Sequence, residues 1–160
     1  MRVKSYWDFR IIIAIACFSV FTFCLLKYFE PVEALDYPIT GQISIPSIEL
    51  ASGVSDVPLT DGELKTPAKH VGSYSKNNNK TLLFGHSTTV FSNLIDATLG
   101  DEIIYNDYIY IVYQIEVSEK SAISMKKLLA PSDKDTIVLM TCYGELYDNG
   151  DSSHRLIIFA

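Results

Sequence analysis

The chain is 160 residues long, with 48% hydrophobic and 20% charged residues, which bounds it to one globular domain plus short attachments. Its formal net charge is −6, and beyond Pro31 nine lysines and arginines stand against seventeen aspartates and glutamates, a net of −8. This acidic balance argues against a nucleic-acid partner.

The N-terminal part contains an apolar run that is long enough to cross a membrane. Residues 11–29 carry a single charge, on Lys27, and a helix needs about 20 such residues to span the hydrocarbon core. Three basic residues precede the run, against Asp8 alone, which by the positive-inside rule keeps the N-terminus in the cytoplasm. We therefore predict a cytoplasmic N-terminus (1–10), a transmembrane signal-anchor (11–29), a linker (30–41) and an extracytoplasmic domain (42–160).

A cleavable signal peptide is the alternative. Val32-Glu33-Ala34 has the small-residue spacing that a signal peptidase accepts, and cleavage there makes Leu35 the first mature residue. The apolar run exceeds the usual signal-peptide core of about 7–15 residues, and Lys27 and Glu30 interrupt the approach to the cleavage site, so the sequence favours the anchor. In both interpretations the domain works outside the cytoplasm.

After the linker, the sequence has the patterns of short strands. Residues 42–50 alternate polar and apolar on both sides of Pro46-Ser47, which predicts a strand pair, and residues 56–70 are typical of a loop. Residues 81–84 predict a buried strand that ends at Gly85-His86-Ser87. The alternation over 103–117 predicts a hairpin that turns at Asn106-Asp107.

Helix is expected in two short places only. Residues 90–99 predict a short helix with Phe91, Leu94 and Ile95 on one side, and residues 123–129 predict one or two turns stopped by Pro131. Seven or eight short strands with so little helix indicate a closed or nearly closed β-barrel.

The last 24 residues, 137–160, bring scarce residue types together. A short apolar run ends in Thr141-Cys142, a polar connection follows, and Arg155 opens a second apolar run. Two strands joined by this connection place Cys142 at the end of one strand and Arg155 at the start of the next. The thiol and the guanidinium are then expected to face each other.

Cys142 is the only cysteine of the predicted exported domain, because Cys17 and Cys24 lie in the apolar N-terminal run. A lone exported thiol is either a buried packing residue or a reactive one. Arg155 is the only arginine after residue 10, and His86 follows a buried strand. A thiol, an imidazole that moves protons and a guanidinium that faces an oxyanion are what acyl transfer through a thioester needs.

At these residues the chain resembles the sortases, the membrane-anchored cysteine transpeptidases of bacterial surfaces. Residues 138–142 match the family's T-L-x-T-C run except at Val138, and Gly85-His86-Ser87 matches its G-H-x step. Arg155 opens the last strand as the family's arginine does, and residues 43–50 resemble the family's first hairpin. The resemblance covers 42–160 and leaves the subclass of this single-pass type unresolved. The order His, Cys, Arg argues against papain-like folds, in which cysteine precedes histidine.

The resemblance implies a closed eight-stranded sortase-like β-barrel in the bacterial cell membrane and a two-step reaction. Cys142 is expected to attack the Thr carbonyl of an LPxTG-like sorting signal of a secreted surface protein, and an amine of peptidoglycan or a pilin lysine to resolve the thioacyl-enzyme. It implies His86 as general acid and base and Arg155 as the residue that positions substrate and stabilises the oxyanion. Thr141 is expected to shape the pocket, and His154 to point to the opposite face of its strand.

No cofactor is predicted. The three histidines are scattered and do not have the spacing of a zinc site. Some sortases bind calcium through acidic loop residues, and Asp56, Asp61 and Glu63 are the candidates here, but no motif supports a calcium site. Two other functions stay open at this point. The first alternative is a membrane-tethered, non-catalytic β-barrel that binds a peptide. The second is a cysteine peptidase that only hydrolyses.

Overall fold

The computed structural model of the chain describes residues 37–77, 79–147 and 151–160. The predicted signal-anchor at 11–29 lies outside the described residues. In the described ranges, no helix is both long and apolar enough to cross a bilayer.

The described chain is built mainly of strands, with one short α-helix and three single-turn 3₁₀ helices, labelled η. In chain order the elements are β1 (Gly41–Ile45), η1 (Pro46–Ile48), β2 (Leu50–Asp56), β3 (Val71–Asn77), β4 (Lys80–Phe84), η2 (Leu94–Asp96), β5 (Glu102–Tyr105), β6 (Tyr108–Ile111), β7 (Gln114–Glu119), η3 (Lys120–Ala122), α2 (Met125–Leu128), β8 (Thr136–Leu146) and β9 (Ser152–Phe159). The predicted mostly-β class is confirmed.

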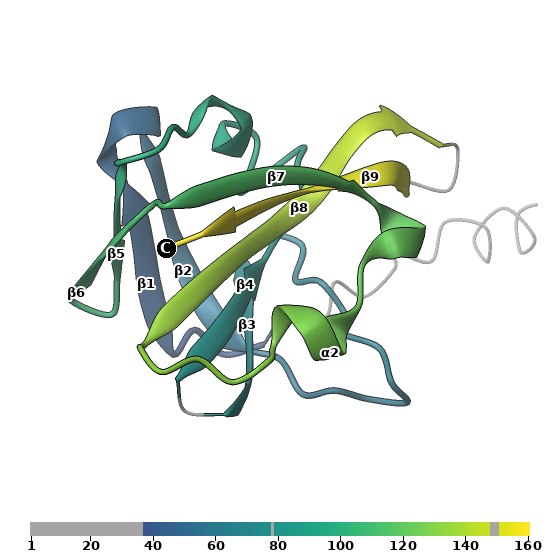
Figure 1. The fold of residues 1–160 in the computed structure, drawn as a ribbon, viewed down its shortest axis with the longest axis horizontal. Helices are drawn as coiled ribbons and strands as arrows, with labels where there is room; N and C mark the ends of the chain where they lie inside the picture. The colour runs from purple at the N-terminus through teal and green to yellow at the C-terminus, as the bar shows by residue number, and fades with distance from the viewer. Residues whose placement is uncertain (1–36, 78, 148–150) are drawn as a thin grey trace, which may run out of the picture. The chain divides into compact units, whose positions relative to one another are not determined.

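All of these strands belong to one curled sheet in the order β6-β5-β1-β2-β3-β4-β8-β9-β7 (Figure 1). The pairs β2–β3 and β4–β8 are parallel, and the other neighbours are antiparallel. A parallel pair needs a long crossover connection. The crossover at 57–70 joins β2 to β3, and the connection that returns to β8 carries α2.

The prediction of eight strands is wrong, because the described sheet has nine. The alternating run expected to form one hairpin is divided into β5, β6 and β7. Val112 N–H donates to Asp101 O at 3.0 Å, and Tyr113 N–H donates to Phe159 O at 2.9 Å. At these two residues the chain leaves β5 and joins β9, so one expected strand becomes two, β6 and β7. These two strands form the two edges of the sheet and do not pair with each other to close a barrel.

The structure confirms the predicted hairpin turn and one of the two predicted short helices. Asn106 and Asp107 have φ of 48° and 69°, the conformation of a two-residue hairpin turn between β5 and β6. Helix α2 lies within the predicted 123–129 segment. The segment 90–99 differs, because it forms turns and the single-turn η2. Leu94 of η2 is buried in the core, as are Phe91 and Ala97 on its two sides, three residues away in each direction. Ile95, expected beside them, is 56% exposed.

The central strands β4, β8 and β9 are buried on both faces. Side chains alternate along a strand, so Ile137 and Leu139 enter the larger core with Leu83, whereas Val138 enters a smaller core with Leu82. The smaller core is covered by Val57 of the 57–70 crossover and by Leu128 and Leu129 at α2. These two covering segments become the walls of the site described next.

Candidate active site

The register of β8 and β9 places Cys142 directly opposite Arg155. Directly opposed residues of an antiparallel pair present their side chains on the same face. Both residues line a cavity of about 370 Å³. The structure therefore places the thiol and the guanidinium opposite each other on neighbouring strands, as expected.

Cys142 does not end its strand, contrary to expectation. Strand β8 continues to Leu146, with a shift in register after Tyr143. Gly144 has a φ of 84°, which favours glycine, and this residue lets the strand bend and resume pairing. Cys142 thus lies within a long strand, where the backbone on both sides is held.

The cavity opens on the face of the smaller core, where that core ends. Met140 and Cys142 follow Val138 on this face, since they lie two and four residues further along the strand. The walls are apolar: Leu59 and Leu64 come from the 57–70 crossover and Met125 from α2. The thiol is half-buried at the floor of this apolar groove.

His86 reaches the same cavity from the end of β4. Strand β4 pairs in parallel with β8, and Phe84 lies beside Met140. Gly85 N–H donates to Met140 O at 3.4 Å, so the chain stays against β8 for one further residue. The side chain of His86 is exposed, as expected of a group that meets an incoming substrate.

Thr141 holds this arrangement together. Its Oγ1 donates to Gly85 O at 2.8 Å, and its side chain is buried. The bond joins the residue before Cys142 to the residue before His86. Thr141 also lines the cavity, but its hydroxyl is directed at the protein backbone, so the structure gives it a positioning role beside the predicted one in the pocket.

Arg155 is anchored by its own strand and by the connection before it. Nη1 donates to Ser152 O at 3.0 Å, to Ser152 Oγ at 2.9 Å and to His154 O at 2.9 Å. Nη2 donates to Asp151 Oδ1 at 2.6 Å. The side chain is only 13% exposed, so the guanidinium has a fixed place at the rim of the cavity.

Asp151 and Ser152 hold Arg155 in place, and the sequence analysis did not single them out. Asp151 also accepts from Lys120 of η3 and lines the cavity. Lys120, then Arg155 and the Ser152 N–H, hold the pKa of the Asp151 carboxyl well below its ordinary value. In sequence these residues belong to a polar Gly/Asn/Asp/Ser connection, and nothing in that composition distinguishes them from a solvated loop.

The other histidines lie outside this cavity. His154 pairs with Tyr143 across β8 and β9, one residue from the Cys142–Arg155 pair, and its Nδ1 is 2.7 Å from Ser153 Oγ. As predicted, it belongs to the opposite face of the strand. His70 is buried and does not line the cavity.

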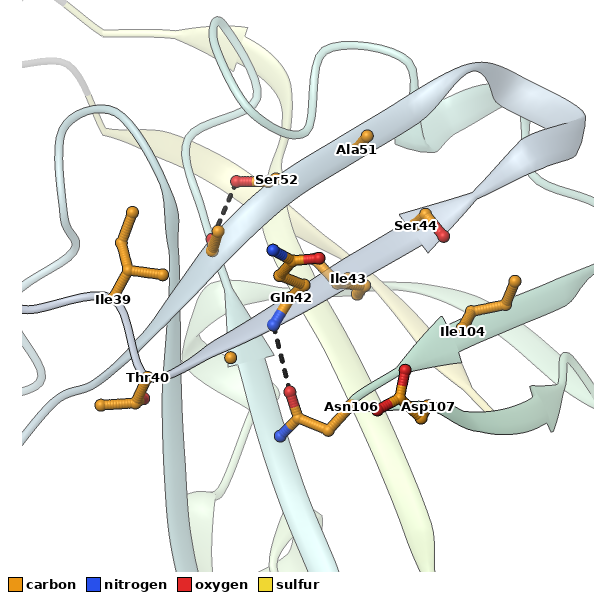
Figure 2. A pocket seen from close by; sticks show the side chains of 12 residues that line it. Ile39, Thr40, Gln42, Ile43, Ser44, Ala51, Ser52, Ile104, Asn106 and Asp107 are labelled. Carbon is orange, nitrogen blue, oxygen red and sulfur yellow. Dashed lines mark hydrogen bonds between the residues drawn. The ribbon is translucent and has the colours of Figure 1, made fainter.

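Two further cavities lie elsewhere on the described domain. A cavity of about 440 Å³ lies on the other side of Cys142 and is lined by Ser87, Ser92 and Tyr143 among others. Figure 2 shows a larger one, about 770 Å³, over β1, β2 and the β5–β6 turn, where Gln42 N–H donates to Asn106 Oδ1 at 3.1 Å. Its lining contains no cysteine, histidine or arginine, so it lacks the three groups that the predicted acyl transfer needs.

The acidic residues considered for calcium do not form a cluster. Asp56 accepts a hydrogen bond from Ser73 Oγ at 2.5 Å, and Asp61 lies in a turn with φ of 53°. Among the described residues, no group of three or more His, Cys, Asp or Glu side chains is placed to hold a metal ion.

The buried Thr141–Gly85 bond generates a prediction on stability. Thr141→Val keeps the shape of the side chain and removes the donor, so the free energy of unfolding should fall by about 1–3 kcal/mol. Thr81→Val is the matched control, because Thr81 lies on neighbouring β4 and its hydroxyl has no hydrogen bond within the described residues. Urea unfolding measures both, and equal losses in the two variants would contradict the role of the bond.

The lowered pKa of Asp151 generates a prediction on pH. A carboxyl whose pKa is lower in the folded state contributes stability above its ordinary value of 3.8 and loses that contribution as pH falls through the folded-state pKa. The free-energy difference between the wild type and Asp151→Asn should therefore stay constant from pH 7 to about pH 5 and shrink below about pH 4. Denaturant unfolding across this range checks it. A difference that grows on acidification contradicts the assignment.

Comparison with known proteins places the chain in a family. The family model of the sortase domain matches residues 43–160. Sortase A from Corynebacterium diphtheriae is 26% identical, with a TM-score of 0.57, over 84% of this chain and 66% of that protein. Sortase C1 from Streptococcus agalactiae is 22% identical, with a TM-score of 0.58, over 76% of this chain and 65% of that protein.

The match thus spans slightly less than two thirds of the length of these two proteins. Sortase A from Listeria monocytogenes is 17% identical, with a TM-score of 0.58, over 76% of this chain and 84% of that protein. No curated protein matches the chain. Because the family model covers residues 43–160, including the cavity and all four predicted site residues, the chain belongs to the sortase family.

Proposed function

We propose that this chain is a cysteine transpeptidase that cleaves an LPxTG-like sorting signal and joins the protein upstream of it to an amine. The observation that carries the proposal is the shared cavity, in which Cys142 lies opposite Arg155 and His86 enters from β4. Membership of the sortase family supports the reaction class.

In the first step, His86 holds the proton of the Cys142 thiol, and the thiolate sulfur bonds to the Thr carbonyl carbon of the sorting signal, so that the carbonyl oxygen becomes an oxyanion. Collapse of this intermediate breaks the Thr–Gly bond, and His86 gives the departing amine its proton. The product is a thioacyl-enzyme. An acceptor amine then attacks the same carbon, His86 takes a proton from it, and the Cys142 thiolate leaves.

Arg155 is suited to stabilise the oxyanion because part of its guanidinium is still available. Arginine carries five N–H donors. Ser152 and His154 accept from Nη1 and Asp151 accepts from Nη2, and within the described residues Nε–H has no acceptor and Nη2 has a single one. A guanidinium anchored on one side needs no reordering when charge develops on the other.

The acceptor and the location are also part of the proposal. We assign the acceptor to a peptidoglycan amine or a pilin lysine, and the substrates to secreted surface proteins. The predicted signal-anchor at 11–29 would keep residues 1–10 in the cytoplasm and hold the domain outside the bacterial cell membrane.

The topology gives one prediction. External protease added to intact cells should digest the chain from about Gln42 onward and leave a protected N-terminal fragment, detected through a tag placed before residue 2. A mature protein that begins at Leu35 would replace the anchor by a cleaved signal peptide.

The chemistry gives the second. Arg155→Lys keeps a positive charge but loses the planar fork, and losing one donor aimed at an oxyanion costs about 10²–10³ in rate. We expect this loss in transpeptidation of an LPxTG peptide followed by mass spectrometry, with His86→Ala and Arg155→Ala at least as poor and Cys142→Ala inactive.

The control is that all variants are folded at the assay temperature and, except Cys142→Ala, alkylate at Cys142. The Arg155 variants should melt at a lower temperature than the wild type, because they lose the contacts with Asp151 and Ser152. Near wild-type turnover by Arg155→Lys would overturn the oxyanion role. Cleavage that yields only the free acid, whether or not an amine is added, would favour the hydrolytic peptidase. An unreactive Cys142 in folded protein would favour the non-catalytic module.

A further inference from the structure

The active-site cavity continues into a second one. This neighbour, of about 520 Å³, lies between the 57–70 crossover and the segment that begins at α2. Leu59, Gly62 and Met125 line both cavities. Leu59 is 50% exposed and Met125 37% exposed, so apolar surface is available at the junction. The two cavities form one extended groove that leads away from Cys142.

The far part of this groove is basic. Lys76 of β3 and Lys126 of α2 both line it, and its lining contains no acidic residue. Within the described residues, neither amine takes part in an ion pair. The whole chain has a formal net charge of −6, so a cavity lined by two lysines and no acidic residue differs in sign from the average charge of the chain. Charge complementarity therefore favours an acidic occupant.

The opposite side of Cys142 holds a separate cavity, whose lining includes Phe91, Ile95 and Leu156. The cavity there shares only Thr141 and Cys142 with the active-site cavity, and it offers hydroxyl groups from Ser87 and Ser92. In a transpeptidase the acyl part of the substrate stays bound through both chemical steps, whereas the leaving part is exchanged for the acceptor. The long groove suits the retained part, and the separate cavity suits the exchanged part.

We propose that the groove holds the peptide upstream of the sorting motif, and that Lys76 and Lys126 select acidic residues there. The proposal rests on the proposed function, because it identifies the acyl side of the same substrate. The leucine and methionine side chains at the junction would contact the motif, and the lysines the residues before it.

The test uses fluorogenic peptides with one fixed LPxTG motif and either Glu-Glu or Lys-Lys directly before it. With full-length wild-type protein at low salt, kcat/KM should be about fivefold higher for the Glu-Glu peptide, and the ratio should approach one in high salt. The double variant Lys76→Glu/Lys126→Glu should reverse the order. Moving the charged pair to the position after the motif should abolish the effect of the two lysines.

Lys127→Glu is the matched control. Lys127 is the next residue of α2, but it lines a different cavity, with Gln114 and Ile157, so its reversal should leave the wild-type preference intact. Equal turnover of the two peptides by the wild type would overturn the proposal, as would an order that the double variant does not change.

A second readout separates this proposal from the proposed function. Binding of the same peptides to Cys142→Ala, measured by fluorescence anisotropy, needs no turnover. Binding that depends on Lys76 and Lys126 without any cleavage by the wild type would retain the groove and reject the transpeptidase. Cleavage without a charge preference would retain the transpeptidase and reject the groove.

Discussion

The pairing of β8 with β9 is the constraint on which the site depends. One residue of slip would turn either Cys142 or Arg155 to the opposite face of the sheet, because side chains alternate along a strand. The register is held on both sides of the pair. Before Cys142 along β8, Leu139 pairs with Ile158 within the larger core. After Cys142, the ladder resumes beyond the bend at Gly144. The chemistry is thus fixed by the burial of apolar residues that take no part in it.

A second set of contacts sets the position of each reactive group within that register. Thr141 of β8 donates a hydrogen bond to Gly85, the residue before His86. Asp151 pairs with both Arg155 and Lys120. Neither contact is made by a reacting atom. In the proposed reaction, both act on groups that must stay in place while charge develops at the substrate, which is where preorganised donors are most effective. The walls of the groove come from connections, so substrate preference can differ while the strands stay the same.

Much of the fold and the site followed from local sequence patterns. The Asn106-Asp107 turn needs two residues that tolerate positive φ, and the chain supplies them. The meeting of Cys142 and Arg155 followed from two apolar runs and a polar connection. The partner switch at Val112 was not predictable, because it depends on hydrogen bonds to residues distant in sequence. Asp151 was missed for the same reason, since its role exists only after β9 is placed beside β8.

The central claim is that Cys142 becomes acylated by the substrate. The most direct measurement is peptide mapping by mass spectrometry of the full-length chain after incubation with an LPxTG peptide and no acceptor amine. The account predicts an acyl group that ends in the substrate threonine, attached to Cys142 alone and released by hydroxylamine. An acyl group on Cys17 or Cys24, or cleavage of the peptide by protein in which Cys142 is already blocked, would contradict it.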